Sequence, residues 1–95
     1  MLSLGLLILK IELPGCASLK EKRGRLKPLL ARLHREFNIS AAETEHLDVW
    51  QSAGIACALA SNDPNHTRRV LQQVARWVEE NWPDVILLEE QIELR

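Results

Sequence analysis

The sequence predicts an α+β domain of the ferredoxin-like type, in which a four-stranded antiparallel sheet carries both helices on one face. Three observations predict it. The chain has 95 residues, a common length for a single domain, so we expect residues 1–95 to form one folding unit. Some segments repeat apolar residues with a period of two and others with helical spacing. Along the chain these segments follow the order β-α-β-β-α-β.

The first half of the chain predicts a strand, a helix and a second strand. Leucine or isoleucine occupies every second position over residues 7–13, up to a Pro-Gly turn, which is typical of a strand. Ser18 stands three residues before Glu21, the spacing of a capping box, and leucines then recur on one face of a helix over residues 19–36. Residues 39–45 predict a short second strand.

The second half predicts a strand, a helix and a last strand. Apolar side chains alternate with glycine and alanine over residues 53–61. Asp63 is a suitable N-cap, Pro64 suits the first helical position, and Pro83 prevents the helix from continuing. Residues 85–94 contain enough β-branched side chains for a fourth strand. Right-handed crossovers then place the first and third strands at the centre, in the order 4-1-3-2.

Composition and the cysteine count exclude several classes of protein. Apolar residues make up 46% of the chain and the net charge is −1, which excludes a disordered chain. Cys16 and Cys57 are too few for a disulfide scaffold and have no metal-ligand spacing. The apolar opening, residues 1–9, lacks a basic leader and is too short to span a bilayer. We expect a cytoplasmic protein with no membrane partner, cofactor or metal.

One face of the predicted sheet carries no helix. The side chains expected there are Lys10 and the row that forms a predicted interface: Ile8, Gly54, Ala56, Ala58 and Ala60. Small residues allow another surface to approach closely, and a domain of this size has little core of its own. We therefore expect a homodimer or a higher homo-oligomer through this face. A partly hydrated face is the alternative.

Charge is distributed unevenly along the chain. Residues 18–37 contain seven basic and two acidic residues, a net charge of +5, so the remainder carries −6. Cations in the first turns of a helix are unfavourable, because the helix dipole is positive at that end. A cluster of cations there therefore predicts that an anion binds between them and the helix end. The predicted anion-binding or nucleic-acid-binding residues are Lys20, Lys22, Arg23, Arg25 and Lys27. A solvated lysine-rich surface and an acidic protein partner are the alternatives.

An acidic group and a cysteine are two further candidates for a functional site. Glu43, Glu45, His46 and Asp48 precede Trp50, but strand alternation places the two glutamates on one side and His46 on the other. A polar hairpin, or a partner contact through Trp50, is therefore favoured over a metal site. Cys16 precedes a basic helix, an environment that activates thiols, yet no histidine lies near it in sequence, which favours an incidental cysteine.

Several motifs, in order along the chain, resemble one family. They are Leu13-Pro14-Gly15, the run from Ser18 to Arg23, the run from Phe37 to Ser40, Ala42-Glu43, Asp48, Trp50-Gln51 and Ser61-Asn62-Asp63. This series is similar to the bacterial DUF503 family, also called YlxP-like, over residues 7 to about 80. The resemblance implies a small ferredoxin-like protein of unassigned function, often encoded beside genes for translation initiation and ribosome-binding factors. Gly24 and Pro28 depart from the expected pattern, and Pro28 predicts a local kink in the helix.

Three functions follow from these observations. The first is a non-catalytic protein that binds structured RNA or the ribosome through the basic helix. A sequence-read single strand is disfavoured because the central strands carry no aromatic side chains. The second is an interaction module that works through its open sheet face. The third is a phosphate-handling enzyme of acylphosphatase-like shape, ranked last because residues 14–18 lack an arginine and a glycine-rich sequence.

Overall fold

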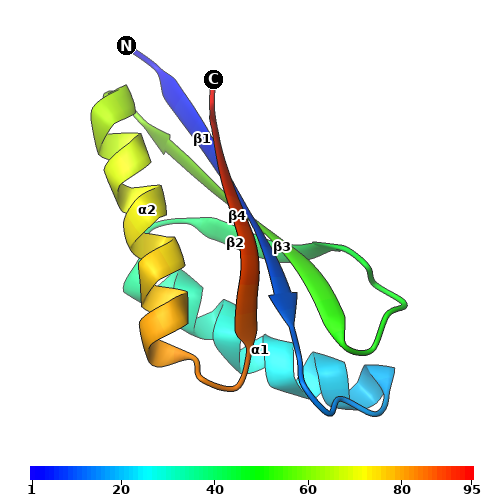
Figure 1. The fold of residues 1–95 in the computed structure, drawn as a ribbon. Coiled ribbons are helices and arrows are strands. Elements are labelled where there is room, and N and C mark those ends of the chain that lie inside the picture. The colour runs from blue at the N-terminus through cyan, green and yellow to red at the C-terminus, as the bar shows by residue number, and fades with distance from the viewer.

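A computed structural model describes all 95 residues, Met1 to Arg95, and contains the six predicted elements in the predicted order (Figure 1). They are β1 (Ser3–Glu12), α1 (Leu19–Glu36), β2 (Ser40–Glu45), β3 (Ser52–Ser61), α2 (Pro64–Asn81) and β4 (Ile86–Leu94). All neighbouring strands are antiparallel and the sheet order is β2-β3-β1-β4. The predicted ferredoxin-like fold is confirmed.

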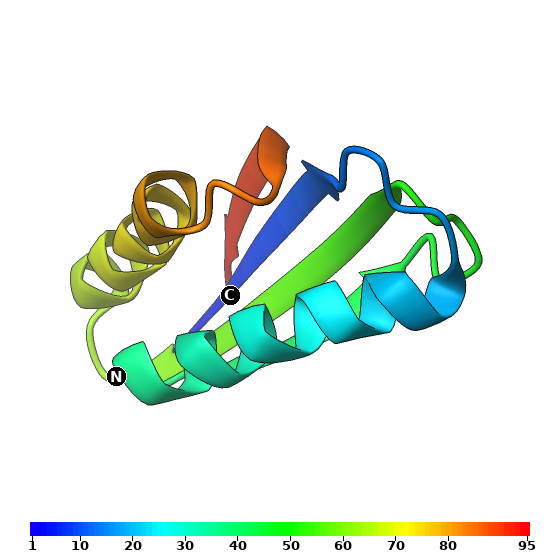
Figure 2. The ribbon, with the colours of Figure 1, turned by 90° about the horizontal axis from the view of Figure 1, so that it is seen from below.

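The molecule has two layers, with both helices against one face of the sheet and the other face open (Figure 2). Alternation along β1 explains this division, because Leu7, Leu9 and Ile11 are fully buried under the helices. β1 begins at Ser3, four residues earlier than predicted, since its pairing with β3 extends to Ser61. The core therefore lies between the helices and the two central strands.

The N-terminus of α1 is capped as the sequence predicts. Ser18 Oγ accepts a hydrogen bond from the Glu21 amide at 3.0 Å, and Glu21 Oε2 accepts one from the Ala17 amide at 2.9 Å. The Ala17 hydrogen bond, with a smaller contribution from Cys16, lowers the pKa of Glu21. The stability from this cap is therefore present above pH 4.5, the ordinary pKa, and is lost as pH falls through the lowered pKa.

Helix α1 continues through Pro28 to Glu36, although proline cannot donate the expected hydrogen bond. Gly24 and Pro28 both lie on the exposed side of the helix. Water can therefore satisfy the carbonyl group of Gly24. The helix remains one continuous element from Leu19 to Glu36 (Figure 2).

Three of the four aromatic side chains pack together near the C-terminal ends of the helices. Phe37 meets the edge of Trp77 at a centroid distance of 6.2 Å, and Trp82 packs on Trp77 at 6.0 Å. The guanidinium of Arg32 lies 5.4 Å from the Trp77 ring centroid. Trp82 thus closes the end of α2.

Helix α2 packs directly against the backbone of β1 at Gly5. A Cβ atom at this position would come within 2.7 Å of Leu71 Cδ1 and closer still to Thr67 Cγ2. Thr67 is fully buried and its hydroxyl lies 3.1 Å from Ser3 Oγ and 2.6 Å from Ser61 Oγ. Glycine at position 5 is therefore required by the distance between α2 and the sheet.

A pair of glycine substitutions tests this close approach. Gly5→Ala should lower the free energy of unfolding by about 1 to 3 kcal/mol, because Thr67 and Leu71 must move. Gly24→Ala should raise it by up to about 1 kcal/mol, because that position is helical and its Cβ would meet nothing within 4 Å. Urea unfolding of both variants measures the difference. Equal effects of the two substitutions would contradict the close approach at Gly5.

Candidate functional site

Lys22 occupies a core position of α1. It lies on the same face as Leu26, Leu29 and Leu33, at spacings of four, seven and eleven residues. The residue is 1% exposed, which is rare for lysine and requires partners for the charge. Its ammonium group therefore has to bind inside the protein.

Three oxygen atoms surround the Lys22 ammonium. It donates hydrogen bonds to the carbonyl oxygens of His46 and Val49, both at 2.7 Å. Glu43 Oε2 forms an ion pair with the same ammonium at 2.7 Å. Lys22 is therefore not available to an external anion, contrary to the prediction from the sequence.

An irregularity in β2 separates Glu43 from Glu45. The register between β2 and β3 shifts between Glu43 and Glu45. Glu43 lies on the same side as the buried Ala41 and points toward Lys22. The shift moves Glu45 to the open face, where its Cβ is 2.7 Å from the place of a Cβ on Gly54. The alternation argument, which put both glutamates on one side, is wrong because it ignored the extra residue. These acidic side chains do not converge on a common point.

Gly54 is not exposed like the other small residues of the predicted interface row, because the register shift places Glu45 beside it. It is buried because Glu45 covers it, whereas Ala58 and Ala60 are exposed. The exposed row on β3 therefore consists of alanines only.

Arg25 is the second predicted cation that binds within the protein. Its Nε and Nη2 donate to the carboxylate of Asp84 at 2.9 and 3.2 Å, and Nη2 also donates to the Asp84 carbonyl at 2.7 Å. Its Nη1 donates to the Pro14 carbonyl at 2.9 Å. The hydrogen bonds to Asp84 raise the pKa of Arg25. Arg25 thus joins the turn before α1 to the turn before β4, and its guanidinium is already occupied.

Three of the five predicted cations remain free. Lys20, Arg23 and Lys27 are exposed, and none of the four ion pairs in the structure includes them. By helix geometry they lie within about 60° of arc and span about 10 Å of the axis. We call these three side chains the basic surface of α1.

An apolar loop lies beside the first turns of α1, as Figure 2 shows for the connection from β2 to β3. Residues 46–51 form this loop, and Leu47, Val49 and Trp50 are 55%, 45% and 50% exposed. The two hydrogen bonds from Lys22 hold its backbone, and Gln51 donates to the Cys16 carbonyl at 3.4 Å. Large apolar side chains on a firmly held loop are typical of a binding surface.

The comparisons with known proteins identify the family of the chain. The family described as "Protein of unknown function (DUF503)" matches residues 4–92. The chain belongs to this family. A relative, the "Uncharacterized protein YlxP" of Bacillus subtilis (strain 168), is 35% identical over 68 residues, which cover 72% of this chain and 73% of the relative. The resemblance that the motifs indicated is confirmed, and neither description assigns an activity.

Sequence reasoning about this DUF503 protein singled out Trp50 but missed Leu47, Val49 and the role of Lys22. A signal was present, because Lys22 continues the leucine spacing of the buried face. The partners of Lys22 lie more than twenty positions away, so the loop could not be assembled from local pattern alone.

The cysteines and His34 contribute to structure. Burial raises the pKa of Cys57 to about 12, so its thiol stays protonated. Cys16 is 1% exposed. His34 Nε2 accepts a hydrogen bond from the Ala41 amide at 3.1 Å, on the outer edge of β2.

Neither α1 nor α2 has both the length and the apolar content that a membrane-crossing helix requires.

Removing the Lys22 ammonium should unfold the site and weaken the domain. Lys22→Met should lower the free energy of unfolding by about 3 kcal/mol or more, because Glu43 loses its ion pair and two carbonyl groups lose their donor. Adding Glu43→Gln should recover part of this loss. Denaturant unfolding measures both, and amide hydrogen exchange over residues 46–51 should accelerate.

Lys20→Met is the matched control for Lys22→Met, because Lys20 is exposed and without an ion pair. Its effect should stay within about 0.5 kcal/mol, as for most surface substitutions. Equal stability of the two variants would show that the buried ammonium does not hold the loop.

Proposed function

We propose that this protein is a non-catalytic RNA-binding protein that contacts structured RNA, including ribosomal RNA, through the basic surface of α1. One observation carries the proposal. Lys20, Arg23 and Lys27 form an exposed row without ion pairs, while Lys22 and Arg25 are occupied inside the protein. Cations left free in a row attract a chain of phosphates and release its counterions. The proposal places the protein in the cytoplasm.

Phosphates would be held by side chains rather than by the amide groups of the helix. The Glu21 amide already donates to Ser18, and the Ala17 amide donates to Glu21. The Glu21 carboxylate also adds negative charge at this end of the helix. Long cationic side chains along α1 therefore supply the contact, which is the pattern expected for recognition of a backbone.

Structured RNA fits this surface better than an extended single strand. The open sheet face carries aliphatic side chains, whereas single-strand binding on such sheets requires aromatic platforms. The exposed Trp50 lies in the loop that Lys22 of the same helix holds, and it offers one ring on which an unpaired base of a folded RNA can stack. The apolar loop would then contact a bulge or loop while α1 contacts phosphates.

The turn before α1 favours binding over phosphate chemistry. A phosphate cradle requires free amide groups that point at the ligand. In this turn the Cys16 amide donates to the Leu13 carbonyl at 3.3 Å and the Ala17 amide donates to Glu21. The third function considered from the sequence, a phosphate-handling enzyme, has no comparable support.

A salt series with a charge-matched control tests the proposal. Lys20→Ala combined with Arg23→Ala should weaken binding to ribosomal RNA and reduce the slope of log K against log salt by about one unit for each lost contact. Arg68→Ala combined with Arg69→Ala removes the same charge from exposed positions on α2 and should leave the slope closer to that of the parent. Equal slopes for both double variants would contradict a role for α1.

The same variant separates a binding surface from a structural one. Lys20→Ala combined with Arg23→Ala should leave the free energy of unfolding unchanged or raise it by a few tenths of a kcal/mol, because two cations near the positive end of the helix dipole are removed. Thermal unfolding measures this. Reduced stability with intact RNA binding would identify the basic surface as part of the scaffold.

A further inference from the structure

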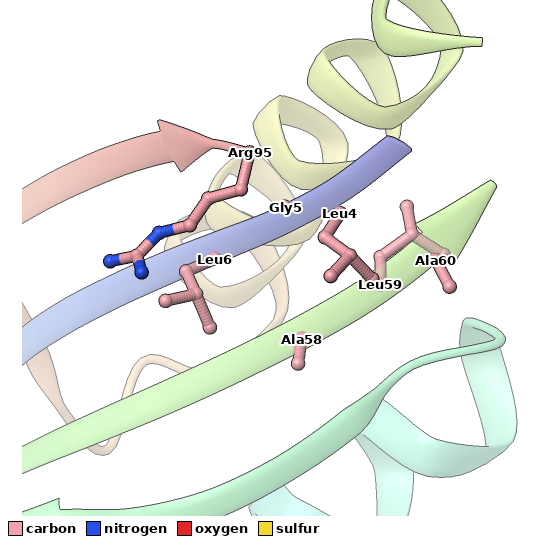
Figure 3. A pocket seen from close by; sticks show the side chains of 7 residues that line it. All are labelled: Leu4, Gly5, Leu6, Ala58, Leu59, Ala60 and Arg95. Atoms are coloured by element: carbon pink, nitrogen blue, oxygen red, sulfur yellow. The ribbon is translucent and has the colours of Figure 1, made fainter. Parts of the chain in front are cut away.

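The open face of the sheet has a regular division between large and small side chains. On β1 the exposed side is occupied by leucine and isoleucine, and on the adjacent strand β3 by alanine. The pairs in register are Leu4 with Ala60, Leu6 with Ala58 and Ile8 with Ala56. Figure 3 shows Leu4 and Leu6 standing beside the much shorter Ala58 and Ala60. The face therefore consists of a ridge and a groove that lie side by side.

The groove is apolar and open. Five of the seven residues around a hollow of about 360 Å³ are hydrophobic, and the Arg95 side chain extends along β1 as far as Leu6 (Figure 3). Leu4 is 46% exposed on the ridge. An apolar ridge and hollow of this kind are costly to leave in water.

We propose that this face binds a second copy of the same chain. A two-fold axis parallel to the strands and midway between β1 and β3 places β1 of each copy over β3 of the other. The ridge of each copy then fills the groove of its partner: Leu4 faces Ala60, Leu6 faces Ala58 and Ile8 faces Ala56. Sheets pack face to face in this manner in β-sandwiches. The proposal is independent of RNA binding, because the basic surface lies on the opposite layer.

Charged side chains at one end of the open sheet face are placed so that the same two-fold axis brings opposite charges together. Lys10 is paired in register with Gly54, and Gly54 with Glu45. None of the ion pairs in the chain includes Lys10 or Glu45. The rotation places Lys10 over the partner's Gly54, which the partner's Glu45 covers, so the Lys10 ammonium meets the carboxylate of the partner's Glu45. Glu89 of the same chain is in register with Lys10 on β4 and lies on the same side of the ammonium as the partner's Glu45.

The other surfaces suited to self-association are less favourable. The outer edge of β4 carries Glu89, Glu90 and Glu93, and pairing two such edges would bring like charges together. On the outer edge of β2, His34 already accepts the Ala41 hydrogen bond. Four strands of this length present a face of about 500 Å² per copy, or about 1,000 Å² in total, the size at which a specific interface begins.

Exchange of charge between two variants tests the axis. In sedimentation equilibrium of the full chain, Lys10→Glu and Glu45→Lys should each raise the dimer Kd at least tenfold, because each homodimer would contain two like-charged contacts. An equimolar mixture of the two variants should regain the dimer, since every contact in the mixed pair joins opposite charges. An intrachain contact could not produce this recovery.

A second pair of variants tests the groove. Ala58→Arg should give a monomer because it fills the hollow, whereas Ala31→Arg, on the exposed side of α1, should leave the dimer intact. Circular dichroism checks that each variant is folded. A parent chain that is monomeric at 100 µM, or a mixture of charge variants that stays monomeric, would overturn the proposal. Lys10→Glu should keep the salt slope of RNA binding, so that failure of this proposal is distinguished from failure of the proposed function.

Discussion

The buried ammonium group of Lys22 organises the end of the domain where the candidate site lies. A charge in this position requires oxygen partners, and the chain supplies them from Glu43, His46 and Val49. Between Glu43 and His46, β2 shifts register, and His46 itself adopts a positive φ of 59°. The loop that follows is consequently held against α1 with its apolar side chains outward. One interaction thus couples a helix, a strand irregularity and the exposure of Trp50.

The basic segment, residues 18–37, contains some cations with partners inside the protein and others with none. Lys22 and Arg25 hold distant turns together, and Arg32 pairs with Glu36 and covers Trp77. The remaining row faces solvent on the outer side of α1. The net charge of this segment therefore overstates the positive charge that is available to an external anion. Only the cations without internal partners form that surface. The open sheet face lies on the opposite layer, so RNA binding and self-association would use separate surfaces.

Local signals in the sequence predicted the architecture closely. The Ser18 capping box and the Asp63-Pro64 start placed both helices, because capping depends on residues within one turn. Period-two alternation placed the strands, and the short chain with two crossovers left few topologies. The exposed cations Lys20, Arg23 and Lys27 were also foreseen, since their exposure follows from their position on the helix.

Features that depend on distant partners were beyond such signals. Whether Lys22 points into the core depends on Glu43 and on a loop more than twenty residues away, and the role of Arg25 depends on Asp84, 59 positions along the chain. The bulge that parts Glu43 from Glu45, and hence the covering of Gly54, arises from pairing with β3. The sequence by itself thus determined the helices, the strands and their caps, because these depend on contacts within a few residues. The order of these elements then determined the topology. The partners of buried charges were settled when packing brought remote segments together, because their free energy depends on desolvation in the folded state.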